Sequence, residues 1–110
     1  MILDELIALF RNIGIASGTS VFPERAPETF CVLTSMYDSD SLHADDEPGF
    51  EVCGVRIGFF TKDSWTLRVA QIKQELRKAG FVISDSRYIE RESDIKLHHY
   101  NIDVEKHYKI

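Results

Sequence analysis

The first hydrophobic pattern along the chain predicts an amphipathic helix at residues 2–13. Apolar side chains recur there every three or four positions on one broad side: Ile2, Leu3, Leu6, Ile7, Leu9, Phe10 and Ile13. Gly14 follows directly and is well placed to end the helix in a left-handed conformation. Because the apolar side is so broad, we expect a sheet to cover this helix.

A second helix is predicted at residues 64–79, with a narrower apolar stripe. Four residues make up this stripe: Trp65, Val69, Ile72 and Leu76. Asp63 or Ser64 can cap the start of the helix, and Gly80 ends it. Leu67 points away from the stripe, so we expect it to be exposed, either as an ordinary surface leucine or as a contact for a partner.

Four further segments predict β-strands because they are rich in β-branched and aromatic residues: residues 29–37, 50–62, 81–91 and 95–106. In the second of these, the parity of the apolar positions changes at Cys53 and Gly54. A β-bulge at that point keeps both halves of the strand facing the same core. A strand buried on both faces is the alternative, which Glu51 and Arg56 disfavour.

The order of these elements predicts an α+β fold. Adjacent strands are expected to pair as hairpins, giving an antiparallel sheet of about four strands with the helices packed on one face. Residues 15–28 contain Gly18, Pro23 and Pro27 and are expected to form an extended connection. Residues 38–49 are expected to form a polar loop. No repeat or shift in composition divides residues 1–110, so we expect a single domain.

Composition fits one soluble domain of ordinary size. The chain has 110 residues, of which 44% are apolar, enough to bury a core without a disulfide or a metal. No apolar run approaches the roughly 20 residues of a membrane span, and Asp4 and Glu5 stand where a signal peptide is basic. Cys31 and Cys53 lack metal-binding spacing, so we expect reduced, buried thiols in a cytosolic protein.

The net charge of -5 is distributed unevenly along the chain. Segment 38–51 has acidic and no basic residues: Asp38, Asp40, Asp45, Asp46, Glu47 and Glu51. Segment 64–79 has one acidic residue, Glu75, and several basic ones: Arg68, Lys73, Arg77 and Lys78. The two segments either attract each other, within a chain or between identical chains, or are two solvated surfaces. A net acidic domain without a basic stripe is a poor candidate for binding nucleic acid.

No arrangement of reactive residues in the sequence predicts catalysis, a cofactor or a metal site. His98 and His99 are neighbours on a predicted strand and point to opposite faces, so they do not readily share a metal. A calcium loop starting at Asp38 fails because unsuitable residues occupy its ligand and glycine positions: Leu42, His43 and Gly49. We therefore expect a protein that is not an enzyme. A small regulatory or ligand-binding domain is one interpretation, ranked above an enzyme that uses Cys53 or the two histidines.

Three parts of the sequence resemble a known family. Residues 43–46 are similar to an aromatic-Ala-Asp-Asn segment, with His and Asp in place of the commoner Tyr and Asn. Residues 55–62 resemble a hydrophobic strand ending in Thr-Lys, and residues 88–92 and 98–105 resemble a final hairpin. In this order and spacing they are similar to the tail terminator, or tail completion, proteins of long-tailed phages and prophages of Gram-positive bacteria. These are also described as minor capsid or minor tail proteins.

This resemblance implies structural work. Such proteins form a ring, usually hexameric, on the end of the finished tail tube. The ring stops polymerisation of the tube and presents a surface for the head connector, and it has no active site or cofactor. The implied partners are further copies of the chain, the tail tube protein and the head connector protein, with no membrane. The implied location is the cytoplasm of the bacterial host during assembly and then the tail of the virion.

The charge pattern suggests two hypotheses for such a ring. A cyclic ring needs an interface in which one patch meets a different patch on the next copy. The candidate residues for these two patches are Asp40, Asp45, Asp46 and Glu47 on one side and Arg68, Lys73, Arg77 and Lys78 on the other. Alternatively, the acidic loop lines the lumen, where its negative charge limits sticking of passing DNA without any specific binding.

Overall fold

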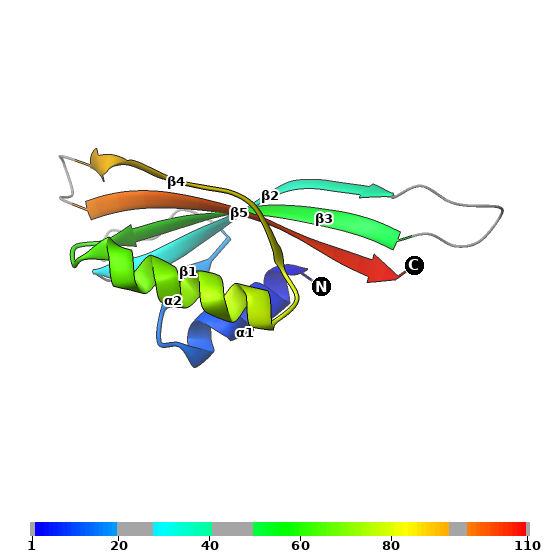
Figure 1. The fold of residues 1–110 in the computed structure, drawn as a ribbon, viewed down its shortest axis with the longest axis horizontal. Coiled ribbons are helices and arrows are strands. Elements are labelled where there is room, and N and C mark those ends of the chain that lie inside the picture. Colours follow the sequence, from blue (N-terminus) through cyan, green and yellow to red (C-terminus); the bar gives the residue numbers. More distant parts are fainter. Residues whose placement is uncertain (1, 20–27, 41–49, 93–96, 110) are drawn as a thin grey trace.

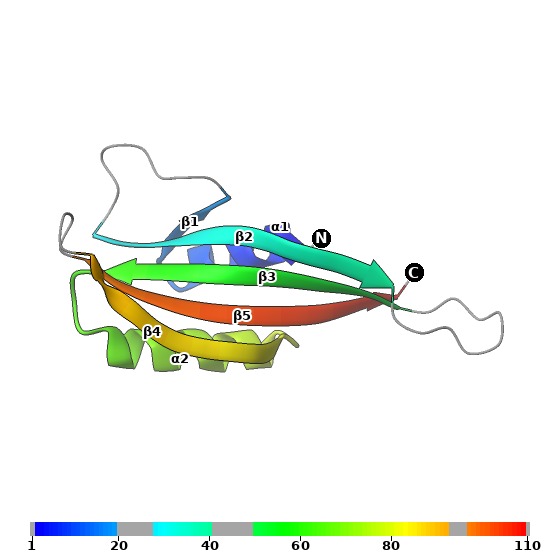
Figure 2. The same ribbon diagram turned by 90° about the horizontal axis from the view of Figure 1, so that it is seen from above.

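The protein forms a five-stranded sheet and two helices. The computed structural model describes residues 2–19, 28–40, 50–92 and 97–109. The elements in chain order are α1 (Ile2–Asn12), β1 (Ala16–Gly18), β2 (Thr29–Asp40), β3 (Phe50–Thr61), α2 (Trp65–Lys78), β4 (Val82–Glu92) and β5 (Leu97–Lys109). Both helices lie on the same side of the sheet (Figure 1), and the strands cross over them in the view from above (Figure 2). The α+β class expected from the sequence is therefore confirmed.

The sheet has the strand order β1-β2-β3-β5-β4. β2 and β3 form one antiparallel hairpin, β4 and β5 form another, and antiparallel pairing of β3 with β5 joins them. β1 adds a short parallel pair with β2, in which Ala16 lies opposite Phe30. The sheet is therefore mixed and five-stranded, and the expectation of four antiparallel strands was wrong in this respect. Three residues are too few to show a period, which is why the sequence indicated only an extended connection there.

The irregularity expected in β3 belongs to β2. β3 pairs with β5 without interruption along its whole length. Against β2 the register shifts, with Ser35 opposite Val55 and Tyr37 opposite Gly54, so Met36 is the extra residue. The predicted bulge at Cys53 and Gly54 was therefore wrong in its strand. Glycine is needed at position 54 because the Tyr37 ring occupies the space that a Cβ there would fill.

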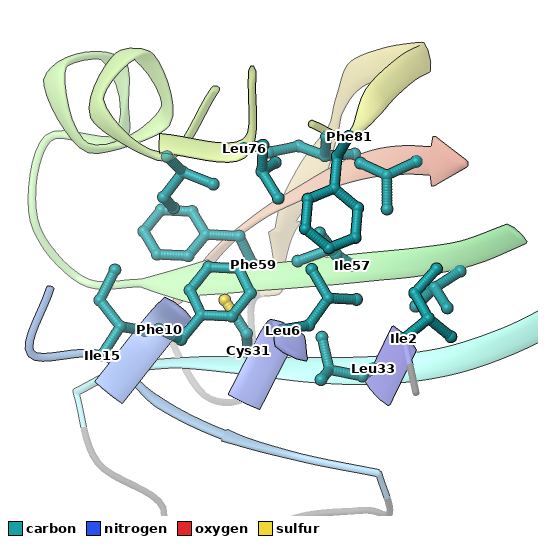
Figure 3. Close-up of a cluster of buried hydrophobic side chains, with 14 of the residues drawn as sticks. Ile2, Leu6, Phe10, Ile15, Cys31, Leu33, Ile57, Phe59, Leu76 and Phe81 are labelled. Carbon is teal, nitrogen blue, oxygen red and sulfur yellow. The ribbon is translucent and has the colours of Figure 1, made fainter. Parts of the chain in front are cut away.

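The core lies between the helices and the sheet. α1 buries Ile2, Leu6 and Phe10, and α2 buries Val69, Ile72 and Leu76. Figure 3 shows the α1 side chains gathered with core residues from the strands, among them Cys31, Leu33, Ile57 and Phe59. Full burial of each large apolar side chain contributes about 1.5–3 kcal/mol to folding. The sheet thus covers α1 as its broad apolar side predicted.

Both helices end in the same hydrogen-bonded motif. Gly14 and Gly80 have positive φ angles of 76° and 90°, the left-handed conformation expected at these positions. The residue after each glycine donates its backbone N–H to a carbonyl five residues earlier: Ile15 to Phe10 at 2.9 Å and Phe81 to Leu76 at 3.0 Å. Both C-terminal predictions are confirmed. At the other end of α2, Ser64 occupies the cap position, but its side chain makes no capping hydrogen bond.

Candidate functional site

The described residues of the acidic segment lie on the parts of β2 and β3 that extend beyond the helices (Figure 1). Asp38 and Asp40 belong to the last part of β2, and Asp40 lies opposite Glu51 at the start of β3. The other residues singled out in this segment lie outside the described residues: His43, Asp45, Asp46 and Glu47. The structure therefore places only that part of the acidic segment which the two strands carry.

Three polar side chains come together at this end of the sheet. Asp38, Glu51 and Cys53 each offer one ligand atom, all within 4.8 Å of one another, an arrangement that can hold a metal ion. The Cys53 thiol donates a long hydrogen bond, 3.5 Å, to Glu51 Oε1. Burial, with the hydrogen bonds and charges of Asp38 and Glu51, raises the pKa of Cys53 to about 12. Metal binding and nucleophilic attack both require the thiolate, so this geometry favours a protonated thiol with a structural role.

The sequence did not reveal this cluster, because its members come from two strands whose register only folding defines. The available signal was the two-residue spacing of Glu51 and Cys53, which puts both side chains on one face of a strand. The other cysteine, Cys31, is buried in the core, and burial raises the pKa of its thiol. The prediction that both cysteines are buried is confirmed.

The basic residues of α2 point in different directions. Lys73 Nζ lies 3.3 Å from the Tyr100 hydroxyl and 5.5 Å from the centre of that ring, so its charge is turned toward the sheet. Arg68 is half-buried. Arg77 and Lys78 are exposed in the last turn of the helix. The four candidate residues therefore do not form one outward patch, and Arg77 and Lys78 carry most of its exposed charge.

The acidic segment and α2 do not pair with each other in the described parts of the chain. The ion pairs found there join other residues, and none links segment 38–51 to a basic residue of α2. In Figure 2 the adjoining ends of β2 and β3 extend past α2. Attraction within one chain is therefore not observed among these residues. A contact between copies, or two solvated surfaces, remain as interpretations.

The side of the sheet opposite the helices has a distinct composition, and we call it the open face. Its members follow from the register, because residues directly opposite one another in the ladder point to the same face. At one end of it, three rings stack across the strands. The centres of Phe30 and Phe60 are 5.0 Å apart, and those of Phe60 and His99 are 4.2 Å apart.

The middle of the open face is polar and carries an excess of acid. Arg56 forms a bidentate ion pair with Asp103, with Nε–Oδ1 at 2.9 Å and Nη2–Oδ2 at 3.1 Å. The Tyr37 ring lies over Gly54, and its pKa is raised by burial and by the nearby carboxylate and hydrogen bond of Glu105. On the described part of this face, four carboxylates stand against two guanidinium groups: Asp85, Glu90, Asp103 and Glu105 against Arg56 and Arg87.

The two adjacent histidines of β5 point to opposite faces, as expected. His98 Nδ1 lies 2.9 Å from the Tyr88 hydroxyl on the helix side of the sheet. His99 Nε2 lies 2.9 Å from Asn101 Oδ1 on the open face. Their rings therefore do not converge on a shared metal, in agreement with the sequence argument.

A groove of about 420 Å³ lies between α1 and α2. Lys106 lines it, with Nζ 3.0 Å from Glu5 Oε2 and 4.7 Å from the centre of the Phe81 ring. The Tyr108 hydroxyl donates to the same Glu5 oxygen at 2.6 Å. Burial acts to raise the pKa of Glu5, but these hydrogen bonds outweigh it, and the net pKa is lowered. The charged groups here bind one another and tie α1 to the sheet.

Comparison with protein-family models finds none that matches the chain, and comparison with curated proteins also finds no match. In the described part of the chain, no helix has the length and apolar character needed to cross a membrane.

Proposed function

We propose that this chain is a structural protein of a phage or prophage tail. In this account it forms a ring on the end of the tail tube, ends polymerisation of the tube and offers a surface to the head connector. Its partners are further copies of itself, the tail tube protein and the head connector protein. The ring of the family that the chain resembles usually has six subunits. It acts in the cytoplasm of a bacterial host during assembly and then in the tail of the virion, without enzymatic activity or a cofactor.

The observation that carries the proposal is where the resembling segments lie. Residues 55–62 belong to β3, residues 98–105 to β5 and residues 88–92 to β4. β3 pairs with β5 and β5 pairs with β4, so these segments form three neighbouring strands at one side of the sheet. The resemblance describes residues 88–92 and 98–105 as a final hairpin, and the pairing of β4 with β5 agrees with that expectation and supports the proposal.

The distribution of charge also supports a ring. A ring closes through contacts between two different patches, whereas a two-fold dimer uses the same patch twice. This chain has unlike surfaces of opposite charge: exposed Arg77 and Lys78 at the end of α2, and carboxylates on the open face and at the end of the β2–β3 hairpin. A heterologous contact between copies can use such a difference.

Assembly of the purified chain tests the proposal. We expect light scattering and native mass measurement to show growth to a closed ring as the chain concentration rises, and higher salt to weaken it. Arg77→Glu and Asp46→Lys are expected to weaken assembly, whereas Arg11→Glu, the same charge reversal at an exposed position of α1, is the matched control. Assembly that is indifferent to salt and to both charge reversals contradicts the charged interface.

A small ligand-binding domain is the second candidate, favoured by the groove between the helices. Its volume of about 420 Å³ lies within the range of small-molecule sites. The charged groups that line it, Glu5 and Lys106, already bind each other, which weakens this interpretation. A tight dimer that gains thermal stability from a metabolite would support it over the ring.

A further inference from the structure

We propose that the outward side of α2 in one copy docks onto the open face of the sheet in the next copy. This inference rests on the proposed function, because it names the two surfaces that meet in the ring. It differs from the contact suggested by the sequence, in which the acidic segment 38–51 receives the helix. In the contact proposed here, the acidic residues instead lie on the open face of β4 and β5.

The receiving surface is a row of residues that crosses four strands. Tyr37 lies opposite Gly54, Gly54 opposite Glu105, and Glu105 opposite Val82, so all four share the open face. Tyr37 is 39% exposed and Val82 is 56% exposed, unusually high values for large apolar side chains. Met36, the bulged residue beside Tyr37, is 44% exposed. Two of the exposed large hydrophobic side chains of the described chain therefore belong to this row, and the exposed Met36 precedes one of them in the chain.

The charge around this row is negative. Glu105 lies within it, and Asp85 and Asp103 form the adjacent pair in the ladder. Arg56 neutralises Asp103, and Arg87 Nη1 approaches Asp85 only to 4.0 Å in an exposed pair. The row thus combines an apolar side chain on each of its outer strands with an excess of carboxylates, which suits a partner that presents an apolar side chain together with a basic group.

The outward side of α2 presents that combination. Leu67 is 81% exposed, the most exposed large apolar side chain in the described chain. Gln71, Gln74 and Lys78 follow it at helical spacing and are exposed, so the four residues form one stripe. From Leu67 to Lys78 the stripe is roughly 16 Å long at 1.5 Å per residue. The row on the sheet is roughly 14 Å across at about 4.8 Å per strand, so the two match in length.

These two surfaces cannot meet within one chain. The helices cover one side of the sheet and the open face is the other side, so α2 points away from it (Figure 1). A second copy of this chain therefore supplies the complementary surface. The contact is heterologous, because the helix surface of one copy meets the sheet surface of the next. One helix face is small compared with the ~800 Å² per partner of a stable pair, so we expect a weak contact that ring closure reinforces.

Disulfide trapping tests this docking directly. Leu67→Cys and Val82→Cys are made in separate chains; the native cysteines are buried and stay unreactive. We expect the mixture to form a covalent dimer at least tenfold faster than either variant alone. The matched control replaces the Val82→Cys chain with Glu28→Cys, at a position whose side chain is 75% exposed and lies outside both surfaces. A mixture no faster than this control overturns the inference, and so does Leu67→Cys pairing with itself at the same rate.

A charge swap separates this inference from the proposed function. Lys78→Glu in the helix-bearing chain is expected to slow trapping several-fold, and Glu105→Lys in the sheet-bearing chain is expected to restore it. If the unmodified chain forms rings while trapping stays at the control rate, the docking geometry is wrong and the proposed function stands. If trapping is fast but the chain neither forms rings nor binds tail tubes, the docking is supported and the proposed function fails.

Discussion

Glu5 connects the first helix of the chain to its last strand. From α1 it accepts hydrogen bonds from Lys106 and Tyr108, both on the last strand. Its side chain stays partly exposed, and hydrogen bonding leaves its pKa below the ordinary value. A carboxyl group whose pKa is lowered by folding stabilises the folded state above its unfolded pKa. This contribution is lost as the pH falls through the folded pKa.

Glu5→Gln is therefore expected to lower the free energy of unfolding by roughly 1–2 kcal/mol at pH 7, because hydrogen bonds to a charged group are lost. Urea unfolding at several pH values measures this loss. The difference between the variant and the unchanged chain should shrink as the pH falls below the ordinary value of 4.5. Glu28→Gln is the control: its pair with Lys62, at 3.6 Å, is exposed, and its removal should cost less than about 0.5 kcal/mol. Equal losses in both variants would contradict the assigned role of Glu5.

The contact between Tyr37 and Gly54 gives a second prediction at the scale of residues. A Cβ at position 54 overlaps the Tyr37 ring, so Gly54→Ala must displace that ring. We expect the free energy of unfolding to fall by about 1–3 kcal/mol. The loss should lie near the lower end of this range, because the Tyr37 ring is partly exposed. In a Tyr37→Ala background the same glycine change should cost much less. Gly58→Ala is the control, since its added Cβ comes no closer than 3.4 Å to a neighbour. Equal costs in the two backgrounds would show that the ring is not the obstacle.

The ends of the helices depend on backbone conformation more than on contacts. The added Cβ of Gly80→Ala would meet Lys106 only at 3.8 Å, and that of Gly14→Ala would meet nothing within 4 Å. Both positions have positive φ, so each alanine variant should lose about 1–2 kcal/mol through backbone strain alone. Thermal unfolding of the two variants checks this. A loss in one variant and none in the other would point to a local contact instead.

Local periodicity was enough to predict most of the elements. The helices and four of the strands follow from the spacing of apolar residues, and the two glycines mark the helix ends. The ends of the strands were less predictable. β2 continues to Asp40 and β5 to Lys109, beyond the runs of apolar residues, because backbone pairing between strands also includes polar residues. The bulge was placed in the wrong strand, since a change of parity in one strand does not show which partner carries the extra residue.

At the scale of the whole molecule, the properties that matter for assembly come from pairing between distant strands. Glu105 and Asp85 are scattered singly along the sequence, and only the pairing of β5 with β4 brings them close together. The sequence showed a contiguous acidic segment but no acidic sheet face. For α2 the sequence predicted a patch that the fold divides. Several basic residues close together predicted one basic patch, but Lys73 points toward Tyr100 and does not join it.

The central claim is that this chain ends a growing tail tube as a ring. Electron microscopy of tail tube protein polymerising with the purified chain tests it most directly. The account predicts tubes of limited length with a closed ring at one end, and longer tubes when the chain is left out. Tubes that grow to the same length with and without the chain, and carry no ring, would contradict it.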